Sequence, residues 1–172
     1  MQFVKLYQNK EYIDQLCELM FQEWQHYGIS KEYLFNFYTK QESNSLPLTF
    51  LLLNNNILIG CFTLHIQNNE LTLSDVFVKK EYRNHGFGTM IVTYAKTYAF
   101  SVLHFDNIKV WIIDKGLSSF YQNLGFKYSC TKVIKDRPHI VMDCFDEGVQ
   151  NIYMFKLLYI FVIVTMVLLF FL

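Results

Sequence analysis

Residues 76–88 read VFVKKEYRNHGFG, and this stretch determines how the rest of the chain is interpreted. An Arg-x-x-Gly-x-Gly pattern at 83–88 lies between an apolar, strand-like run at 71–78 and a helical pattern over 89–103. Glycines in such a loop let consecutive backbone N–H groups turn toward one centre, and the start of the next helix adds its positive dipole end. The stretch therefore predicts a loop that binds a pyrophosphate.

Basic side chains crowd the same loop, since Lys79, Lys80, Arg83 and His85 all fall within it. Such side chains suit a polyanionic ligand. A dinucleotide-binding fingerprint is a poor alternative, because the first glycine of Gly-x-Gly-x-x-Gly is absent and three consecutive strands, not a βαβ unit, are expected before the loop.

Hydrophobic periodicity places this loop in a mixed α/β domain. In the first helix Ile13, Leu16, Met20 and Trp24 recur at helical spacing after a possible cap at Asn9, and Ser30 caps a second helix. Asparagine-rich turns at 54–56 and 67–69 separate three strands that should form a meander. The expected order is β-αα-βββ-α-β-α-ββ, with strands at 2–7, 48–53, 57–66, 71–78, 108–113, 127–133 and 139–144 and later helices at 89–103 and 117–123.

Two motifs resemble the GCN5-related N-acetyltransferase (GNAT) superfamily. Residues 76–88 resemble its motif A, and residues 119–126, SFYQNLGF, resemble its motif B, with one helix and one strand between them as in the family. The resemblance covers about residues 2–144 and implies the GNAT acyltransferase fold, an α/β fold with a mixed, mostly antiparallel sheet. A GNAT N-acetyltransferase domain is predicted over residues 1–148.

The resemblance implies acetyl-CoA as co-substrate, wedged where the fourth and fifth strands separate. Phe77 and Val78 match strand positions whose backbone pairs with the pantetheine arm, and one of their N–H groups would polarise the thioester carbonyl. Asp114 stands where many members carry an asparagine that bonds the cofactor arm; an ionised carboxylate cannot donate, so that contact is altered or missing. The implied pyrophosphate loop comprises Arg83, Asn84, His85, Gly86, Phe87, Gly88 and Thr89.

The same resemblance implies the catalytic groups. Tyr121 matches the usual general acid, which protonates the leaving thiolate; the alternative is a packed aromatic residue. Asp75 is expected to be the catalytic base or to anchor the substrate ammonium, the alternative being a solvated strand carboxylate. Some relatives that acetylate small amines and amino sugars read Glu-Asp where this chain reads Ser74-Asp75, and His65 is the reserve candidate for the base.

The acceptor pocket of this fold is formed by the two N-terminal helices and the last hairpin. These parts supply Trp24, Tyr27, Tyr33, Phe37 and Tyr38 and a turn at 135–138. In a chain with 18% aromatic residues, we interpret these aromatic side chains as core. They do not identify the acceptor.

Overall charge and cysteine spacing limit the remaining function classes. The 172 residues contain 15 Lys and Arg and 15 Asp and Glu, so the chain lacks the basic excess of a general nucleic-acid binder. The four cysteines are scattered without Cys-x-x-Cys spacing, and no metal site is expected.

Residues 152–172 contain one charged residue, Lys156, and otherwise read as a membrane span. As a helix this segment would be about 31 Å long. We expect residues 149–172 to be a C-terminal tail anchor, with one transmembrane helix in the lipid bilayer at 152–172. Since residues 1–7 lack the apolar region of a signal peptide, the domain should face the cytosol, on the endoplasmic reticulum or the mitochondrial outer membrane.

Two functions from different classes follow. The first is a membrane-tethered, acetyl-CoA-dependent N-acetyltransferase that acts by direct attack in a ternary complex on a primary amine, either a protein N-terminus or lysine or a small amine. The second is a catalytically degenerate GNAT-fold binding module, which the departures at Ser74 and Asp114 would allow.

Overall fold

Paired asparagines close two hairpins of the sheet, as predicted. In the computed structural model, which describes residues 1–134 and 136–148, Asn55 and Asn56 have φ of 48° and 61°, and Asn68 and Asn69 have φ of 53° and 63°. Two successive left-handed residues form the turn that matches the twist of adjacent antiparallel strands. These turns join β2 (Leu48–Asn54), β3 (Ile57–Gln67) and β4 (Glu70–Val78) into the expected meander.

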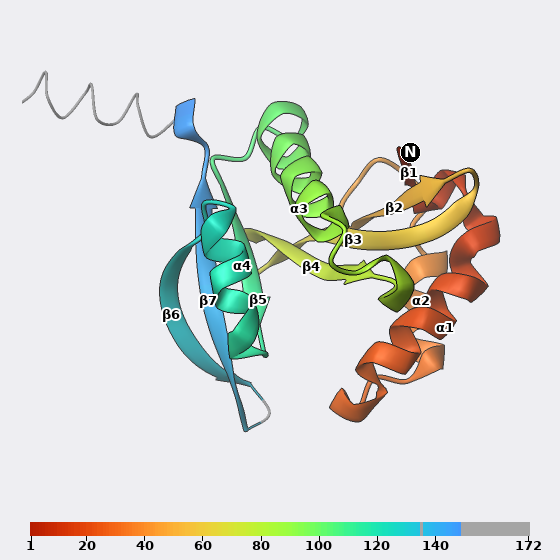
Figure 1. Cartoon of the computed structure of the whole chain (residues 1–172), viewed down its shortest axis with the longest axis horizontal. Helices are drawn as coiled ribbons and strands as arrows, with labels where there is room; N and C mark the ends of the chain where they lie inside the picture. The colour runs from red at the N-terminus through yellow and green to blue at the C-terminus, as the bar shows by residue number, and fades with distance from the viewer. Residues whose placement is uncertain (135, 149–172) are drawn as a thin grey trace, which may run out of the picture.

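In the described residues the sheet has seven strands, in the order β1-β2-β3-β4-β5-β7-β6 (Figure 1). The remaining strands are β1 (Gln2–Lys5), β5 (Asn107–Ile112), β6 (Lys127–Ile134) and β7 (Arg137–Phe145). Only β4 and β5 pair in parallel; every other neighbouring pair is antiparallel. The final hairpin folds back so that β7 lies between β5 and β6, an order that the sequence pattern did not predict.

Helices cover both faces of the N-terminal half of the sheet (Figure 1). Along β2, Phe50 and Leu52 belong to the core under α3 (Phe87–Thr97), whereas Leu51 and Leu53 belong to the core under α1 (Ile13–Trp24) and α2 (Lys31–Thr39). This alternation is what a strand buried on both faces requires. The predicted α4 is also present, at Ser118–Asn123.

Helix ends differ from the predictions at several places, including α3, which ends at Thr97 and continues as a π-helical turn over Tyr98–Val102. The Ser30 side chain caps α2 by accepting from the Tyr33 backbone N–H at 3.1 Å. Asn9 does not cap α1: its side chain donates to the Lys5 carbonyl, and a 3₁₀ turn precedes the helix. α3 begins at Phe87, two residues before the predicted start, because Gly86 makes the entry turn at φ 80°.

The predicted transmembrane segment at 152–172 and the anchor at 149–172 lie outside the described residues. Within the part that the structure does describe, no helix combines the length and the apolar character needed to cross a bilayer. The boundary of the GNAT domain at residue 148 therefore remains a prediction.

Candidate active site

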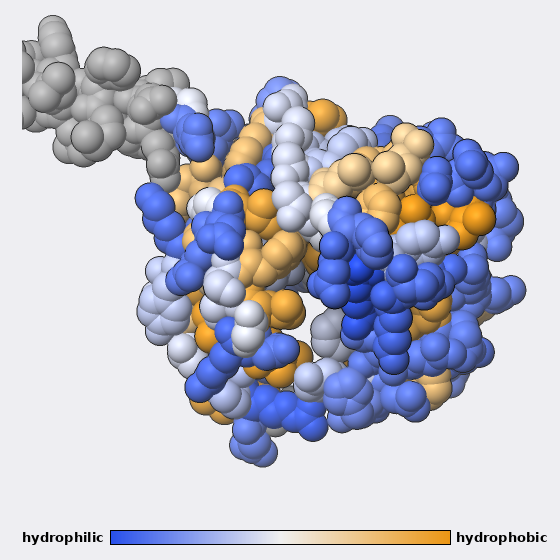
Figure 2. All heavy atoms as spheres, viewed as in Figure 1, coloured by the Kyte–Doolittle hydropathy of each residue, from blue (hydrophilic) through white to orange (hydrophobic). Residues whose placement is uncertain are grey.

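The site begins where β4 and β5 separate. They pair only at Thr72–Lys109 and Leu73–Val110, and beyond this point the ladder ends. The ammonium of Lys109 holds the closed end together, with its Nζ 2.8 Å from the Glu70 carboxylate and 3.3 Å from that of Asp143. Figure 2 shows an opening between the two halves of the molecule on this face.

Three cavities lie in and beside this separation, and they share lining residues. A loop cavity of about 550 Å³ adjoins the glycine-bearing loop, a middle cavity of about 230 Å³ lies between β4 and β5, and an aromatic cavity of about 570 Å³ lies under α2. Tyr121 lines the first two, Asp75 lines the last two, and Trp24 lines all three. The three cavities therefore adjoin one another in a row from the loop, past Tyr121, to Asp75.

A β-bulge in β4 sets the position of Asp75. Asp75 has φ 52°, and the register with β3 shifts so that Asp75 and Val76 together lie opposite Phe62. A bulge re-aims side chains and increases local twist. Aspartate tolerates this left-handed conformation better than most residues, which is the only hint of the bulge in the sequence.

Phe77 and Val78, the two strand residues predicted to contact the cofactor arm, differ in the direction of their backbone N–H groups. The Lys79 N–H donates to the Ile59 carbonyl of β3 at 2.9 Å. Because successive amides point to opposite edges of a strand, the Phe77 amide also faces β3, while the Val78 amide faces the separation from β5. Of Phe77 and Val78, the geometry leaves Val78 to meet a ligand with its N–H.

Arg83 is committed to the protein rather than open to a phosphate. Its Nε donates to the Val78 carbonyl at 2.8 Å, and its Nη2 lies 3.1 Å from both oxygens of the Glu23 carboxylate on α1. The guanidinium also lies 5.7 Å from the centre of the Phe77 ring. Arg83 therefore ties the loop to β4 and α1, and its charge is largely neutralised by Glu23.

The glycine-bearing loop provides backbone rather than side chains. Gly86, the N-cap of α3, has φ 80°, and a Cβ there would meet nothing within 4 Å. Gly86, Gly88, Asn84 and Thr89 line the loop cavity together with the start of α3. His85 and Phe87 do not line it: His85 Nδ1 bonds the Arg83 carbonyl at 2.7 Å, and Phe87 packs edge-on against Tyr82.

Tyr121 is both packed and exposed to the cavities. Its ring makes edge contacts with Phe120 and Phe126, and the residue is only 6% exposed. Burial raises the pKa of the Tyr121 phenol above its usual range, which keeps it protonated at neutral pH. Tyr121 was expected to be either a general acid or a packed aromatic residue. The structure shows a packed ring that also lines the loop and middle cavities, so the two descriptions are compatible.

Asp114 follows β5, beside Tyr121 in both the loop and middle cavities. Its carboxylate accepts from the Gly116 N–H at 2.8 Å and so caps the turn that precedes α4. One carboxylate oxygen is thus already used within the chain, and the expectation that this departure alters a cofactor contact stays a prediction.

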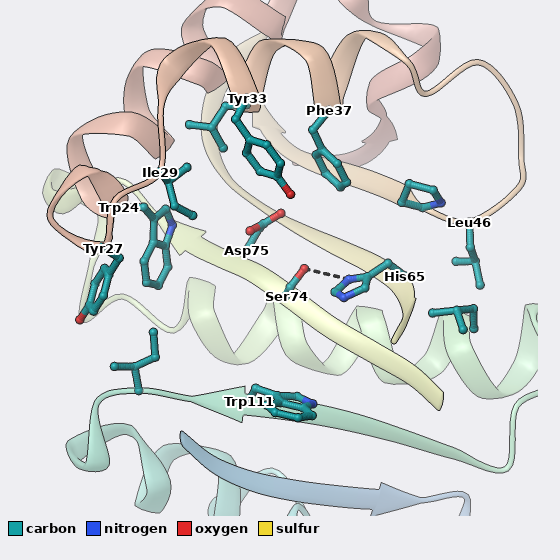
Figure 3. A pocket seen from close by; sticks show the side chains of 14 residues that line it. Trp24, Tyr27, Ile29, Tyr33, Phe37, Leu46, His65, Ser74, Asp75 and Trp111 are labelled. Carbon is teal, nitrogen blue, oxygen red and sulfur yellow. Dashed lines mark hydrogen bonds between the residues drawn. The ribbon is translucent and has the colours of Figure 1, made fainter. Parts of the chain in front are cut away.

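Asp75 lies at the centre of the aromatic cavity (Figure 3). Burial raises the pKa of the Asp75 carboxyl, although the Thr63 hydroxyl, the His65 ring and the Tyr38 hydroxyl act in the opposite direction. His65 Nδ1 lies 3.1 Å from the Ser74 hydroxyl and His65 Nε2 lies 3.3 Å from the Gln67 amide oxygen. The cavity is lined by Trp24, Tyr27, Ile29, Tyr33, Leu34, Phe37, Leu46, Pro47, His65, Ile66, Ser74, Asp75, Trp111 and Ile113.

The aromatic residues interpreted as core are mostly cavity wall. Trp24, Tyr27, Tyr33 and Phe37 line the aromatic cavity, and only Tyr38 is fully buried. The interpretation failed because helical spacing cannot distinguish a side chain packed in a core from one packed around an opening in the sheet.

Sequence reasoning also missed several functional residues. Tyr38 was named but interpreted only as core; its buried hydroxyl lacks a hydrogen-bond partner among the residues described, and its pKa is raised by burial and by Asp75. Trp111 and Glu23 are two others, and each depends on contacts between segments far apart in the sequence. In the described ranges, no group of three or more His, Cys, Asp or Glu side chains is placed to hold a metal ion.

Comparisons with known proteins bear on the family and the fold of the chain. The sequence profile of the Acetyltransferase (GNAT) family matches residues 10–126. A chimera of spermidine N-acetyltransferase SpeG from Vibrio cholerae and hSSAT has a similar structure, with a TM-score of 0.71 and 18% identity over 88% of this chain and 99% of that one. No curated protein matches the sequence.

Aminoglycoside acetyltransferases are also similar in structure. An aminoglycoside 6'-N-acetyltransferase complexed with coenzyme A has a TM-score of 0.71 and 17% identity, over 84% of this chain and 97% of that one. An aminoglycoside 6'-acetyltransferase type Ii has a TM-score of 0.68 and 21% identity over the same shares. At these identities the likenesses show a common fold.

Proposed function

The chain belongs to the GNAT family of acetyltransferases, which use acetyl-CoA as co-substrate, and from this premise we propose that it acetylates a primary amine by direct attack in a ternary complex. The proposal rests on the three adjoining cavities, which follow one another from the loop at Gly86, past Tyr121, to Asp75. A donor bound at one end and an amine bound at the other would meet in the middle cavity. Direct transfer needs no covalent enzyme intermediate.

The loop cavity fits the donor. The exposed amides of Gly86, Gly88 and Thr89 at the start of α3 suit a pyrophosphate, and Gly86 leaves the open space that a Cβ would take. The Val78 N–H faces the separation between β4 and β5, where it can donate to the carbonyl oxygen of a bound thioester. When bound, acetyl-CoA supplies an acetyl group activated as a thioester.

Asp75 is the proposed base. A substrate ammonium must lose one proton before its nitrogen can attack, and the Asp75 carboxylate accepts that proton at the end of the row of cavities. The raised pKa of this carboxyl brings its basicity closer to what the task needs. His65 is the weaker candidate, because Ser74 and Gln67 already engage both of its ring nitrogens.

Tyr121 is the proposed general acid. Its phenol donates a proton to the departing CoA sulfur, and the second proton lost by the nitrogen as the amide forms restores the phenol. One ammonium thus yields one amide, one CoA thiol and one proton held by Asp75 and then released to water. Burial keeps the Tyr121 phenol in the protonated form that this role requires.

Replacing Tyr121 with phenylalanine tests this function directly. We expect Y121F to lower kcat about tenfold to 30-fold with little change in acetyl-CoA affinity, since a CoA thiolate can also leave unprotonated at a cost. CoA release with an amine acceptor gives kcat, and calorimetry gives the affinity. Tyr128→Phe is the matched control, because Tyr128 is 60% exposed on β6.

The alternative function is a binding module without catalysis, and it predicts a different result in the assay of CoA release. It is supported by two features. One Asp114 carboxylate oxygen already accepts a hydrogen bond within a turn, and Ser74 stands where some relatives have a carboxylate. It predicts that the wild-type chain binds acetyl-CoA while no amine raises CoA release above background. That result would replace the enzyme with the module.

We also propose that residues 152–172 anchor the domain in a membrane, with residues 1–148 on the cytosolic side, on the endoplasmic reticulum or the mitochondrial outer membrane. The support lies in the sequence: beyond Lys156 the segment has no charged residue, and an apolar run of that kind inserts far more firmly than a single acyl chain.

Removing the segment tests the anchor. A chain ending at residue 150 should move to the soluble fraction, whereas the full chain should stay in the membrane pellet through alkaline carbonate and high-salt washes. Sedimentation of each chain after fractionation gives the answer. If the shortened chain still pellets at high salt, a second attachment exists and the proposed anchor does not explain membrane association.

A further inference from the structure

The residues that line the aromatic cavity indicate what kind of amine it can accept, which the family resemblance does not. Most of its wall is apolar or aromatic, with Trp24 and Tyr27 at one side, Tyr33 and Phe37 above, and Trp111 opposite (Figure 3). Such a wall favours a substrate body that is itself apolar or aromatic, since flat rings stack on one another and exclude water.

The charges around the cavity limit how many ammonium groups it can hold. Asp75 is the only carboxylate among the described residues that line it. An ammonium leaving water needs a charged or strongly polar partner, and each additional unpaired one is strongly disfavoured. One carboxylate therefore provides for one ammonium, the one that is to be acetylated.

A cation lies close to each of two lining rings. The Arg137 guanidinium lies 4.8 Å from the centre of the Tyr27 ring, and the Lys132 ammonium lies 5.0 Å from the centre of the Trp111 ring. These charges raise the electrostatic potential near the cavity and oppose a second substrate ammonium. Toward the loop cavity, the Glu23 carboxylate is paired with Arg83, and the Asp114 carboxylate keeps its charge but does not line the aromatic cavity.

The Arg137–Tyr27 contact has a second consequence. It joins the hairpin between β6 and β7 to the connection between α1 and α2, on opposite sides of the cavity. The contact favours a small substrate over a peptide segment, because a peptide that extended past it would have to separate Arg137 from the Tyr27 ring.

We propose that the acceptor is a small primary amine with a single ammonium group on an aromatic or bulky apolar body. This inference rests on the proposed acetyltransfer and specifies its substrate class. In this arrangement the ammonium meets Asp75, and the body of the amine lies among Trp24, Tyr33, Phe37 and Trp111. A polyamine or an aminoglycoside would place further ammonium groups where no second carboxylate lines the cavity in the described residues, leaving them only weaker contacts with ring faces.

The test compares four acceptors with the full chain in detergent and saturating acetyl-CoA. The probes are 2-phenylethylamine, spermidine, kanamycin and a ten-residue peptide with a free N-terminus, with CoA release as the readout. We expect kcat/KM for 2-phenylethylamine to exceed that for spermidine and kanamycin by about 100-fold, as expected when extra ammonium groups lack partners. Equal or better turnover of any other probe would overturn the substrate class and leave the acetyltransferase intact.

A designed variant tests whether the single carboxylate of the cavity causes the preference for one ammonium group. Ile66 lines the cavity and is 45% exposed, so Ile66→Glu adds a second carboxylate with little risk to the fold. We expect I66E to raise the ratio of spermidine to 2-phenylethylamine turnover about tenfold. Ile57→Glu makes the same change on the same strand at a residue that is 51% exposed and outside the cavity, and should leave the ratio unchanged.

The remaining outcomes are also decisive. An unchanged ratio in I66E, or an equal shift in I57E, would overturn the charge argument even if 2-phenylethylamine is preferred. No CoA release above background with any of the four probes would overturn both the substrate class and the proposed function, whatever the affinity for acetyl-CoA.

Discussion

Replacing Asp75 with asparagine is expected to lower kcat by about 100- to 10,000-fold, the range typical of a lost general base. Asparagine has nearly the same shape as aspartate and is the other residue that readily adopts φ near 52°, so the bulge should persist. Affinity for acetyl-CoA should change little, because Asp75 does not line the loop cavity. Steady-state kinetics and calorimetry measure the two quantities separately.

The pH profile separates a base from a structural carboxylate. Because burial raises the pKa of Asp75, the wild-type kcat/KM should fall on the acidic side at a pH above the ordinary aspartate value of about 3.9. Activity requires the carboxylate, so it rises with pH through this limb. The residual activity of D75N should lack the limb, since asparagine does not titrate.

Stability should move in the opposite direction to activity. A carboxyl whose pKa is higher in the folded than in the unfolded chain favours folding most at low pH, and this contribution is lost as the pH rises through the folded-state pKa. At neutral pH the charged Asp75 is therefore a cost, and D75N should have an equal or higher Tm. Asp106→Asn, at an exposed residue, is the control, with kcat and Tm unchanged.

Two results would contradict this assignment. A D75N variant with nearly normal kcat would show that another group, with His65 first among them, accepts the proton. A D75N variant that loses activity and Tm together would point to a structural carboxylate, because the catalytic role predicts loss of kcat alone.

Local chemistry made much of this fold predictable. The asparagine pairs at 55–56 and 68–69 specify their turns by their own conformational tolerance, and Ser30 caps α2 by a bond within one turn. Gly86, with φ 80°, could be assigned to a turn at the start of a helix for the same reason, while the phosphate-binding role of the loop stays a prediction. Such features depend on residues close together in the sequence, so they can be read without a structure.

Other parts of the site depend on contacts between distant segments and could not be predicted. Nothing near Arg83 indicates that Glu23, sixty residues earlier, would take its guanidinium. The pairing of β7 with β5 could not be predicted either. With the β6–β7 hairpin in this place, Arg137 and Lys132 lie close to rings that line the aromatic cavity. Strand order and buried charge pairing are set by the global packing of apolar faces, which periodicity alone does not determine.

Replacing Gly86 with glutamate is expected to weaken acetyl-CoA binding by on the order of 100-fold or more, since it sets a carboxylate against the pyrophosphate. Gly86 faces open space at the start of α3, so the new side chain would occupy the volume that the phosphates need. It would also oppose the attraction that the helix N-terminus has for an anion. Calorimetry with acetyl-CoA measures the loss.

The chain offers a matched control for backbone strain. Gly28 has the same φ of 80° and, like Gly86, nothing within 4 Å of its added Cβ, but it ends the turn after α1 and lies outside the loop cavity. Both glutamate variants should lose about 1 kcal/mol of stability, because an L-residue is disfavoured at this φ. Only G86E should lose affinity for acetyl-CoA. Equal loss of affinity in both variants would mean that strain explains the effect, and retained affinity in G86E would place the phosphates elsewhere.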